Sequence, residues 1–150
     1  MLKYKSIKMK NFGCYRDQFL SFSTDSKKPI TVINAENFKG KTTLLNAFRF
    51  ALTGSIYGRF SGSKNSEKKT ISTFINNISK KEDNAKELYV KLNFEFENKD
   101  YSITRRCDIN NKSTKSNDLD MNEDGFVIER EKAIDILENI MNEATSRFFL

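Results

Sequence analysis

The chain has 150 residues, of which 37% are hydrophobic, so it is long enough for one domain with a core rich in Phe, Ile and Leu. No apolar run approaches the roughly 20 residues that span a membrane, and the start lacks a signal-peptide core, so we expect a cytoplasmic protein with no membrane partner. The absence of His excludes a Ser-His-Asp triad and His metal ligands, and the net charge of +6 is compatible with nucleic acid without requiring it.

The N-terminal residues predict a strand hairpin. Leu2 to Lys10 alternates between polar and apolar residues, which indicates an edge or half-buried strand, and residues 11–13 follow as a turn. Gln18 to Ser23 has strand character and returns as the second strand. Cys14 and Cys107 lie far apart with no Cys-x-x-Cys motif, so they predict two partly buried free thiols rather than a zinc site or a disulfide.

The segment from Pro29 to Thr53 organises the chain. It reads as a buried strand, a tight loop and a helix that Gly54 ends. β-Branched apolar residues at 30–33 predict a strand covered on both faces. The apolar residues of the helix are Leu44, Leu45, Ala47, Phe48, Ala51 and Leu52.

Gly40, Lys41 and Thr42 lie where this strand turns into the helix, and their chemistry is that of phosphate binding. Successive backbone N–H groups that lead into a helix N-terminus bind anions. In a P-loop, Lys41 would reach the β- and γ-phosphates and the Thr42 hydroxyl would hold Mg²⁺. An ordinary strand, loop and helix with a chance Gly-Lys-Thr-Thr is the alternative.

Two positions depart from the P-loop pattern. Ala35 replaces a Gly, and its methyl group fits unless φ is positive there. Phe38 stands where the DNA-repair ATPases often have a second Gly. If that position needs a positive φ, Phe38 costs about 1–3 kcal/mol of strain.

After Gly54 the sequence predicts a loop and then a short helix. Residues 55–69 are rich in Gly, Ser and basic residues, which are either solvated or contact DNA phosphates. The spacing of apolar residues in 71–78 predicts an amphipathic helix of two turns, with a charged linker over 79–86. The basic residues in question are Arg59, Lys64, Lys68 and Lys69, and the apolar ones are Ile71, Phe74, Ile75 and Ile78.

Residues 88–97 alternate strictly and give the clearest half-buried strand, with Phe94 and Phe96 in the core. Residues 101–108 return antiparallel, and we expect Arg105 and Arg106 to be solvated rather than bound to phosphate.

The C-terminal third predicts an irregular polar loop over 110–124, a short strand over 125–128 and a helix from Arg130 to Asn142. Acidic residues at 129–131 suit the start of this helix, because they face the positive end of its dipole. The chain ends on Ser-Arg-Phe-Phe-Leu, and we expect it to be the first part of a longer protein.

A P-loop close behind a two-stranded meander with Asn-Phe resembles the N-terminal lobe of the SMC-like ATPases, the AAA_23-type ABC ATPases that include RecF and RecN. The run Val-Lys-Leu-Asn-Phe-Glu-Phe-Glu-Asn-Lys-Asp-Tyr-Ser-Ile-Thr-Arg is similar to the second sheet of that family. The C-terminal Ser-Arg-Phe-Phe-Leu, with Leu-Leu-Asn-Ala-Phe-Arg-Phe-Ala-Leu-Thr-Gly, most resembles the DndD branch, linked to DNA phosphorothioation and phage restriction.

The resemblance implies an α/β fold: a P-loop NTPase of the ABC head type with an antiparallel β-subdomain, in which residues 1–150 are one partial head domain. It implies ATP and Mg²⁺ as ligands, and DNA, a second ATPase head and other defence or nuclease subunits as partners. Tyr15 and Arg16 occupy the region where the family often contacts the nucleotide base or ribose. The phosphate cradle would consist of Glu36, Asn37, Phe38, Lys39, Gly40, Lys41, Thr42 and Thr43, with Thr42 on the metal.

Several motifs of that family are absent from the sequence. It has no signature motif and no Walker B run, and its only Gln, Gln18, is not placed as a Q-loop residue. Phosphoryl transfer needs positioning and electrostatics, and only the phosphate-binding half is present, so we expect poor ATP hydrolysis by the isolated chain. The alternatives are a nucleotide-sensing module that does not hydrolyse and a degenerate P-loop domain with a structural role.

Overall fold

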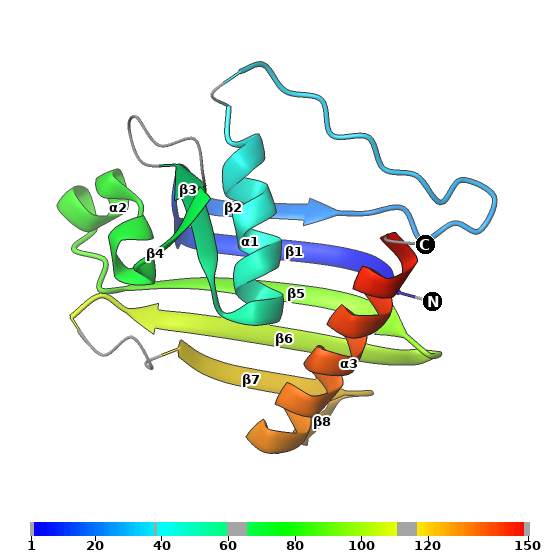
Figure 1. Ribbon diagram of the computed structural model, residues 1–150. Coiled ribbons are helices and arrows are strands. Elements are labelled where there is room, and N and C mark those ends of the chain that lie inside the picture. The colour runs from blue at the N-terminus through cyan, green and yellow to red at the C-terminus, as the bar shows by residue number, and fades with distance from the viewer. Residues whose placement is uncertain (1, 38, 60–65, 111–116, 149–150) are drawn as a thin grey trace.

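The computed structural model describes residues 2–37, 39–59, 66–110 and 117–148. Six strands form one antiparallel sheet in the order β2-β1-β5-β6-β7-β8 (Figure 1). They are β1 (Lys3–Phe12), β2 (Tyr15–Ser21), β5 (Glu87–Phe96), β6 (Lys99–Asp108), β7 (Asn117–Glu123) and β8 (Phe126–Ile128). The remaining elements are α1 (Lys41–Thr53), the β3 (Ile56–Arg59) and β4 (Ser66–Lys69) hairpin, the 3₁₀ turn η1 (Ile71–Phe74), α2 (Asn77–Glu82) and α3 (Arg130–Phe148).

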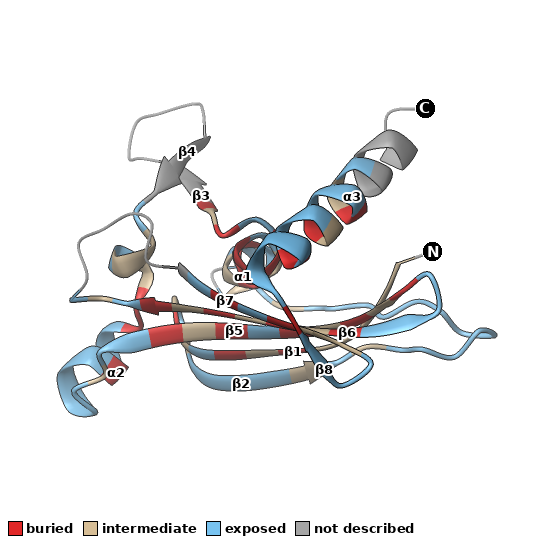
Figure 2. Cartoon of the chain, turned by 90° about the horizontal axis from the view of Figure 1, so that it is seen from below, coloured by how far each residue is buried: buried red, intermediate tan, exposed pale blue. Residues whose placement is uncertain are grey.

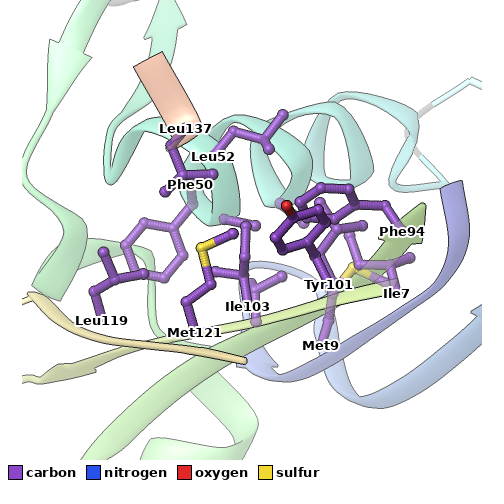
Figure 3. Packing of buried hydrophobic residues seen from close by; sticks show 14 of the residues in the cluster. Ile7, Met9, Phe50, Leu52, Phe94, Tyr101, Ile103, Leu119, Met121 and Leu137 are labelled. Atoms are coloured by element: carbon purple, nitrogen blue, oxygen red, sulfur yellow. The ribbon is translucent and has the colours of Figure 1, made fainter. Parts of the chain in front are cut away.

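Helices α1 and α3 lie on the same face of the sheet, and none of the described helices covers the opposite face (Figure 2). This one-sided cover matches the alternation of β5, whose inward side chains from Leu88 to Phe96 are buried while those between them are not. Phe50 of α1 packs into the same core (Figure 3). The prediction that Phe94 and Phe96 belong to the core is confirmed. None of the described helices is long and apolar enough to cross a membrane.

The hairpin is confirmed, but its turn lies at residues 13–14 instead of 11–13, and β2 begins at Tyr15 instead of Gln18. The helix after Gly40 and the last helix are confirmed. β1 pairs with β2 as predicted, but it also pairs with β5, so it is an interior strand rather than an edge. Gly54 ends α1 in the left-handed region, with φ of 69° and its N–H donating to the Phe50 carbonyl. The last helix starts at Arg130 as predicted and continues to Phe148, beyond the predicted end at Asn142.

The buried strand predicted at 30–33 is wrong for the structure of this chain. Residues 22–36 contain no strand, and the side chains of Ile30 and Val32 are 78% and 83% exposed. The segment stands off the sheet and leaves a hollow of about 640 Å³ above Tyr4, Phe22 and Phe48. A strand needs a hydrogen-bonded neighbour, and none of the described strands pairs with this segment.

Two predicted loops contain strands. Part of 55–69 forms the β3–β4 hairpin, and the side chains of the four basic residues there lie outside those that the structure describes. Part of 110–124 is β7, because Leu119 and Met121 point into the core from an otherwise polar run.

The helix predicted over 71–78 is divided. Its first part is the 3₁₀ turn η1, and α2 begins only after Asn76, whose side chain accepts hydrogen bonds from the N–H groups of Ile78 and Ser79 at 3.1 and 3.0 Å. The predicted linker over 79–86 therefore starts inside α2. A strong N-cap outweighs the apolar spacing and moves the helix start.

Candidate nucleotide-binding site

The candidate site is the loop that leads into α1. The helix starts directly after Gly40, has no side-chain cap, and carries no acidic residue in its first turn. Because the first N–H groups of a helix have no partner within it, this end is suited to an anion. The sequence prediction that Gly40, Lys41 and Thr42 lie at the loop-to-helix junction is confirmed.

The Lys41 side chain folds back over the loop. Its Nζ donates to the backbone carbonyls of Ala35 at 2.6 Å and of Glu36 at 2.8 Å. The Lys39 N–H points to the same Glu36 carbonyl at 3.4 Å, so the loop curls around the ammonium group. An ammonium has three donors, which leaves one beyond these two bonds to meet a phosphate oxygen.

Only a glycine fits at position 40 without strain. Its φ is +97°, a region that side chains of L-residues rarely adopt. A Cβ at this position would lie 2.6 Å from the Tyr15 hydroxyl oxygen and 2.8 Å from Cys14 Sγ. The turn between β1 and β2 therefore presses directly against the start of α1.

Tyr15 connects that turn to the loop. Its hydroxyl donates to the Gly40 carbonyl at 3.1 Å. Burial raises the pKa of the Tyr15 phenol, and the neighbouring Cys14 raises it further, so the hydroxyl is a neutral donor at physiological pH. The same turn reaches the first turn of α1, since a Cβ on Gly13 would meet the Thr43 methyl group at 2.6 Å.

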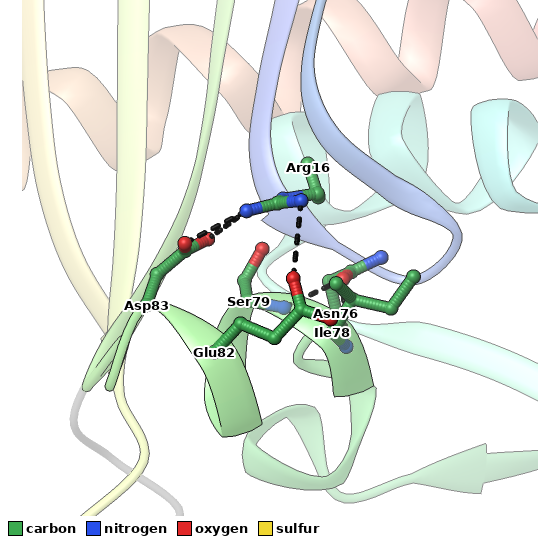
Figure 4. Close-up of polar contacts among 6 residues, drawn as sticks. All are labelled: Arg16, Asn76, Ile78, Ser79, Glu82 and Asp83. Atoms are coloured by element: carbon green, nitrogen blue, oxygen red, sulfur yellow. Dashed lines mark hydrogen bonds and ion pairs between the residues drawn. The ribbon is translucent and has the colours of Figure 1, made fainter.

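Arg16, the neighbour of Tyr15, faces a different element. Its Nη2 contacts both carboxylate oxygens of Asp83 at 2.7 and 2.8 Å, and Nη1 lies 3.5 Å from Glu82 (Figure 4). In this arrangement the Arg16 guanidinium ties β2 to the end of α2, and of these two neighbours it is Tyr15 that contacts the loop before α1.

The other predicted cradle residues are placed as follows. Asn37 and Thr42 are both exposed, Asn37 in the loop and Thr42 in the first turn of α1. Ala35 does not have a positive φ, so its methyl group is accommodated without backbone strain. Phe38 lies outside the described residues, and the strain predicted for it stays a prediction.

Arg105 is buried, so the prediction that its side chain is solvated is wrong. It is 9% exposed rather than solvated, and its Nε and Nη2 donate to the carbonyls of Ala51 and Leu52, at 2.8 and 3.3 Å. Burial lowers the pKa of its guanidinium to about 10, and Arg130 adds to the effect. Its burial could have been predicted from the alternation of β6, because Arg105 lies on the same inward face of the strand as Ile103. Arg105 thus caps the last turn of α1 and fixes the end of the helix opposite the loop.

These features define an α/β lobe in which the core helix α1 begins at a phosphate-type loop. The chain belongs to the AAA_23 family of AAA domains, whose sequence profile matches residues 6–150. A comparison with curated proteins finds no match.

The solved structures similar to this chain include the following two. A chain from a structural study of ATP-driven dimerization and DNA-stimulated activation of SMC ATPases is 23% identical, with a TM-score of 0.60 over 93% of this chain and 80% of that one. The recombination mediator protein RecF with ATP, from the RecFOR pathway, is 20% identical, with a TM-score of 0.51 over 85% of this chain and 28% of that one. These likenesses confirm the predicted fold class, the N-terminal lobe of an ABC-type ATPase head.

Proposed function

We propose that this chain is the ATP-binding N-terminal lobe of an SMC-like, DNA-associated ATPase. The observation that carries the proposal is the loop itself: Gly40 at positive φ, Lys41 folded over the loop carbonyls, and an uncapped helix start behind them. Membership of the AAA_23 family supports ATP as the nucleotide.

The residues of the loop fit ATP and Mg²⁺ in type. The Lys41 ammonium would bind phosphate oxygens, the N–H groups at the start of α1 would complete the cradle, and the Thr42 hydroxyl would bind the metal. Mg²⁺ supplies charge neutralisation on the phosphates when it is bound. The chain itself contributes binding and orientation, and we expect hydrolysis to need the Walker B and signature residues of a second part.

The exposed segment before the loop supports a second lobe as partner. Ile30, Val32 and Ile33 are all exposed although their composition is that of a covered strand. Burying such side chains is favourable by roughly 1.5–3 kcal/mol each, so a neighbouring strand from the rest of an ATPase head is the partner that fits them. In this proposal, residues 1–150 are one partial head domain, and these three exposed side chains mark where the rest of the head packs.

The wider assembly follows from the similar structures. A dimer of heads and contact with DNA are proposed because one similar protein undergoes ATP-driven dimerization and DNA-stimulated activation. The DndD-like sequence features favour phosphorothioation-linked phage defence, with nuclease or other defence subunits, and the likeness to RecF favours DNA repair. We propose a cytoplasmic location for either role.

The test is isothermal titration of the chain with Mg-ATP. Lys41→Ala removes the loop ammonium, and Lys91→Ala removes an equal charge from the exposed face of β5 as a matched control. We expect Lys41→Ala to weaken binding roughly ten- to hundredfold, as for a charged hydrogen-bonding group. Equal binding by all three proteins would refute the site. A folded wild-type chain that binds nothing would favour the degenerate, structural alternative.

Measuring steady-state ATP hydrolysis distinguishes the ATPase lobe from the second alternative, a nucleotide-sensing module. Binding without hydrolysis, also after addition of DNA, would favour a nucleotide-sensing module. Robust, Lys41-dependent hydrolysis by the isolated chain would contradict the expectation that the catalytic half lies elsewhere.

A further inference from the structure

We propose that Tyr15 is a positioning residue for the phosphate loop, and that its hydroxyl orients the backbone N–H of Lys41 through the Gly40 carbonyl. The inference rests on the proposed function and adds a residue to it. The bond that carries it joins Tyr15 Oη to the Gly40 oxygen at 3.1 Å.

The planar peptide bond transmits this contact. The Gly40 carbonyl and the Lys41 N–H belong to one trans peptide unit, so they point in opposite directions. A donor that holds the Gly40 carbonyl in place therefore also fixes the direction of the Lys41 N–H. The Leu44 N–H holds the same carbonyl at 2.9 Å, so the oxygen is fixed by two donors.

Gly40 makes such support necessary. A glycine loses more backbone freedom on ordering than any other residue, and at φ of +97° no side chain limits its rotation. The Tyr15 hydroxyl and Cys14 Sγ lie beside Gly40, within 2.6 and 2.8 Å of where a Cβ would stand, and this packing limits the backbone rotation instead.

Tyr15 is itself held from behind. The Gly13 N–H donates to the Phe74 carbonyl at 2.7 Å, and Asn76 Nδ2 donates to the Gly13 carbonyl at 2.9 Å. Asn76 also caps α2, so the turn that carries Tyr15 is fixed to the start of a helix. The backbone that leads into Tyr15 is thus anchored through Gly13, which fixes the place from which the hydroxyl reaches the Gly40 carbonyl.

The experiment compares Tyr15→Phe with Tyr89→Phe, which removes the same hydroxyl from the helix-free face of β5. In Mg-ATP titrations we expect Tyr15→Phe to bind about three- to tenfold more weakly, the loss typical of one neutral hydrogen bond, and Tyr89→Phe to bind as the wild type does. Without nucleotide we expect Tyr15→Phe to melt slightly below Tyr89→Phe, because one hydrogen bond is lost, and to remain fully folded at the temperature of the titration. Wild-type affinity in Tyr15→Phe would overturn the inference.

A second readout needs no nucleotide. In ¹H–¹⁵N spectra of the free protein, Tyr15→Phe should shift the Lys41 amide resonance, and Tyr89→Phe should leave it in place. A shifted amide in a protein that fails to bind Mg-ATP would retain the positioning role and refute the nucleotide function. An unchanged amide would overturn the positioning role whatever the protein binds.

Discussion

Replacing Gly40 by Ala tests the phosphate loop by a single methyl group. The positive φ costs a non-glycine residue about 1–3 kcal/mol, and the lower entropy of the unfolded chain returns about 0.4–1 kcal/mol. The methyl group would also lie 2.6 Å from the Tyr15 oxygen, so the hydroxyl has to move and its bond to the Gly40 carbonyl, worth about 1 kcal/mol, is lost. We expect Gly40→Ala to lower the free energy of unfolding by about 1–3 kcal/mol.

Gly125→Ala is the matched control. Gly125 has a similar φ of +89°, but a Cβ there would meet nothing within 4 Å. It therefore reports the backbone strain without the contact. Urea unfolding at 25 °C measures both variants, with the slope m as a check that only stability has changed.

The difference between the two glycine variants is the decisive quantity. We expect Gly40→Ala to cost about 1 kcal/mol more than Gly125→Ala, and the excess to shrink in the Tyr15→Phe background, where the blocking oxygen is gone. Equal losses at both glycines would refute the reasoning, because the contact between the turn and the loop would then carry no energy.

Two further predictions concern the core and the thiols. Phe94→Ala should lower the free energy of unfolding by about 3–5 kcal/mol, because Phe94 is fully buried and stacks on Tyr101. As a control, Phe19→Ala should change it by less than about 0.5 kcal/mol, because the Phe19 side chain is 58% exposed. Similar losses for the two variants in denaturant unfolding would contradict this packing. Brief alkylation of the native protein at pH 8 should modify the exposed Cys14 and leave Cys107, whose thiol pKa is raised by burial, until the chain unfolds; mass spectrometry that finds both thiols modified at equal rates would show that β6 opens readily.

Elements with a clear period were predictable from the sequence. Strict alternation in residues 88–97 predicts β5, and the apolar residues of α1 with Gly40 and Gly54 on either side predict the helix from Lys41 to Thr53. Both signals are local, because a strand face or a helix cap is determined by residues a few positions apart.

The misplaced features depend on distant partners. The composition of 30–33 indicates burial, but it does not say which strand lies beside it. The charge of Arg105 predicts a solvated side chain, although Arg105 lies on the inward face of β6 and reaches the carbonyl end of α1. The contact of Tyr15 with Gly40 joins a hairpin to a helix start, and no local pattern in the sequence predicts it.

The pairing of β1 with β5 also bears on how the chain folds. Strands β5 to β8 are joined in succession by short connections, whereas β1 meets β5 only when residues 10 and 89 come together. Closing that long loop costs more entropy and makes this step slow relative to the hairpins. Tyr15 and α1 both belong to the segment closed by this step, so we expect the anion cradle to be among the last parts of the lobe to become ordered. Recovery of Mg-ATP binding during refolding would then mark the end of folding, after most of the sheet has formed.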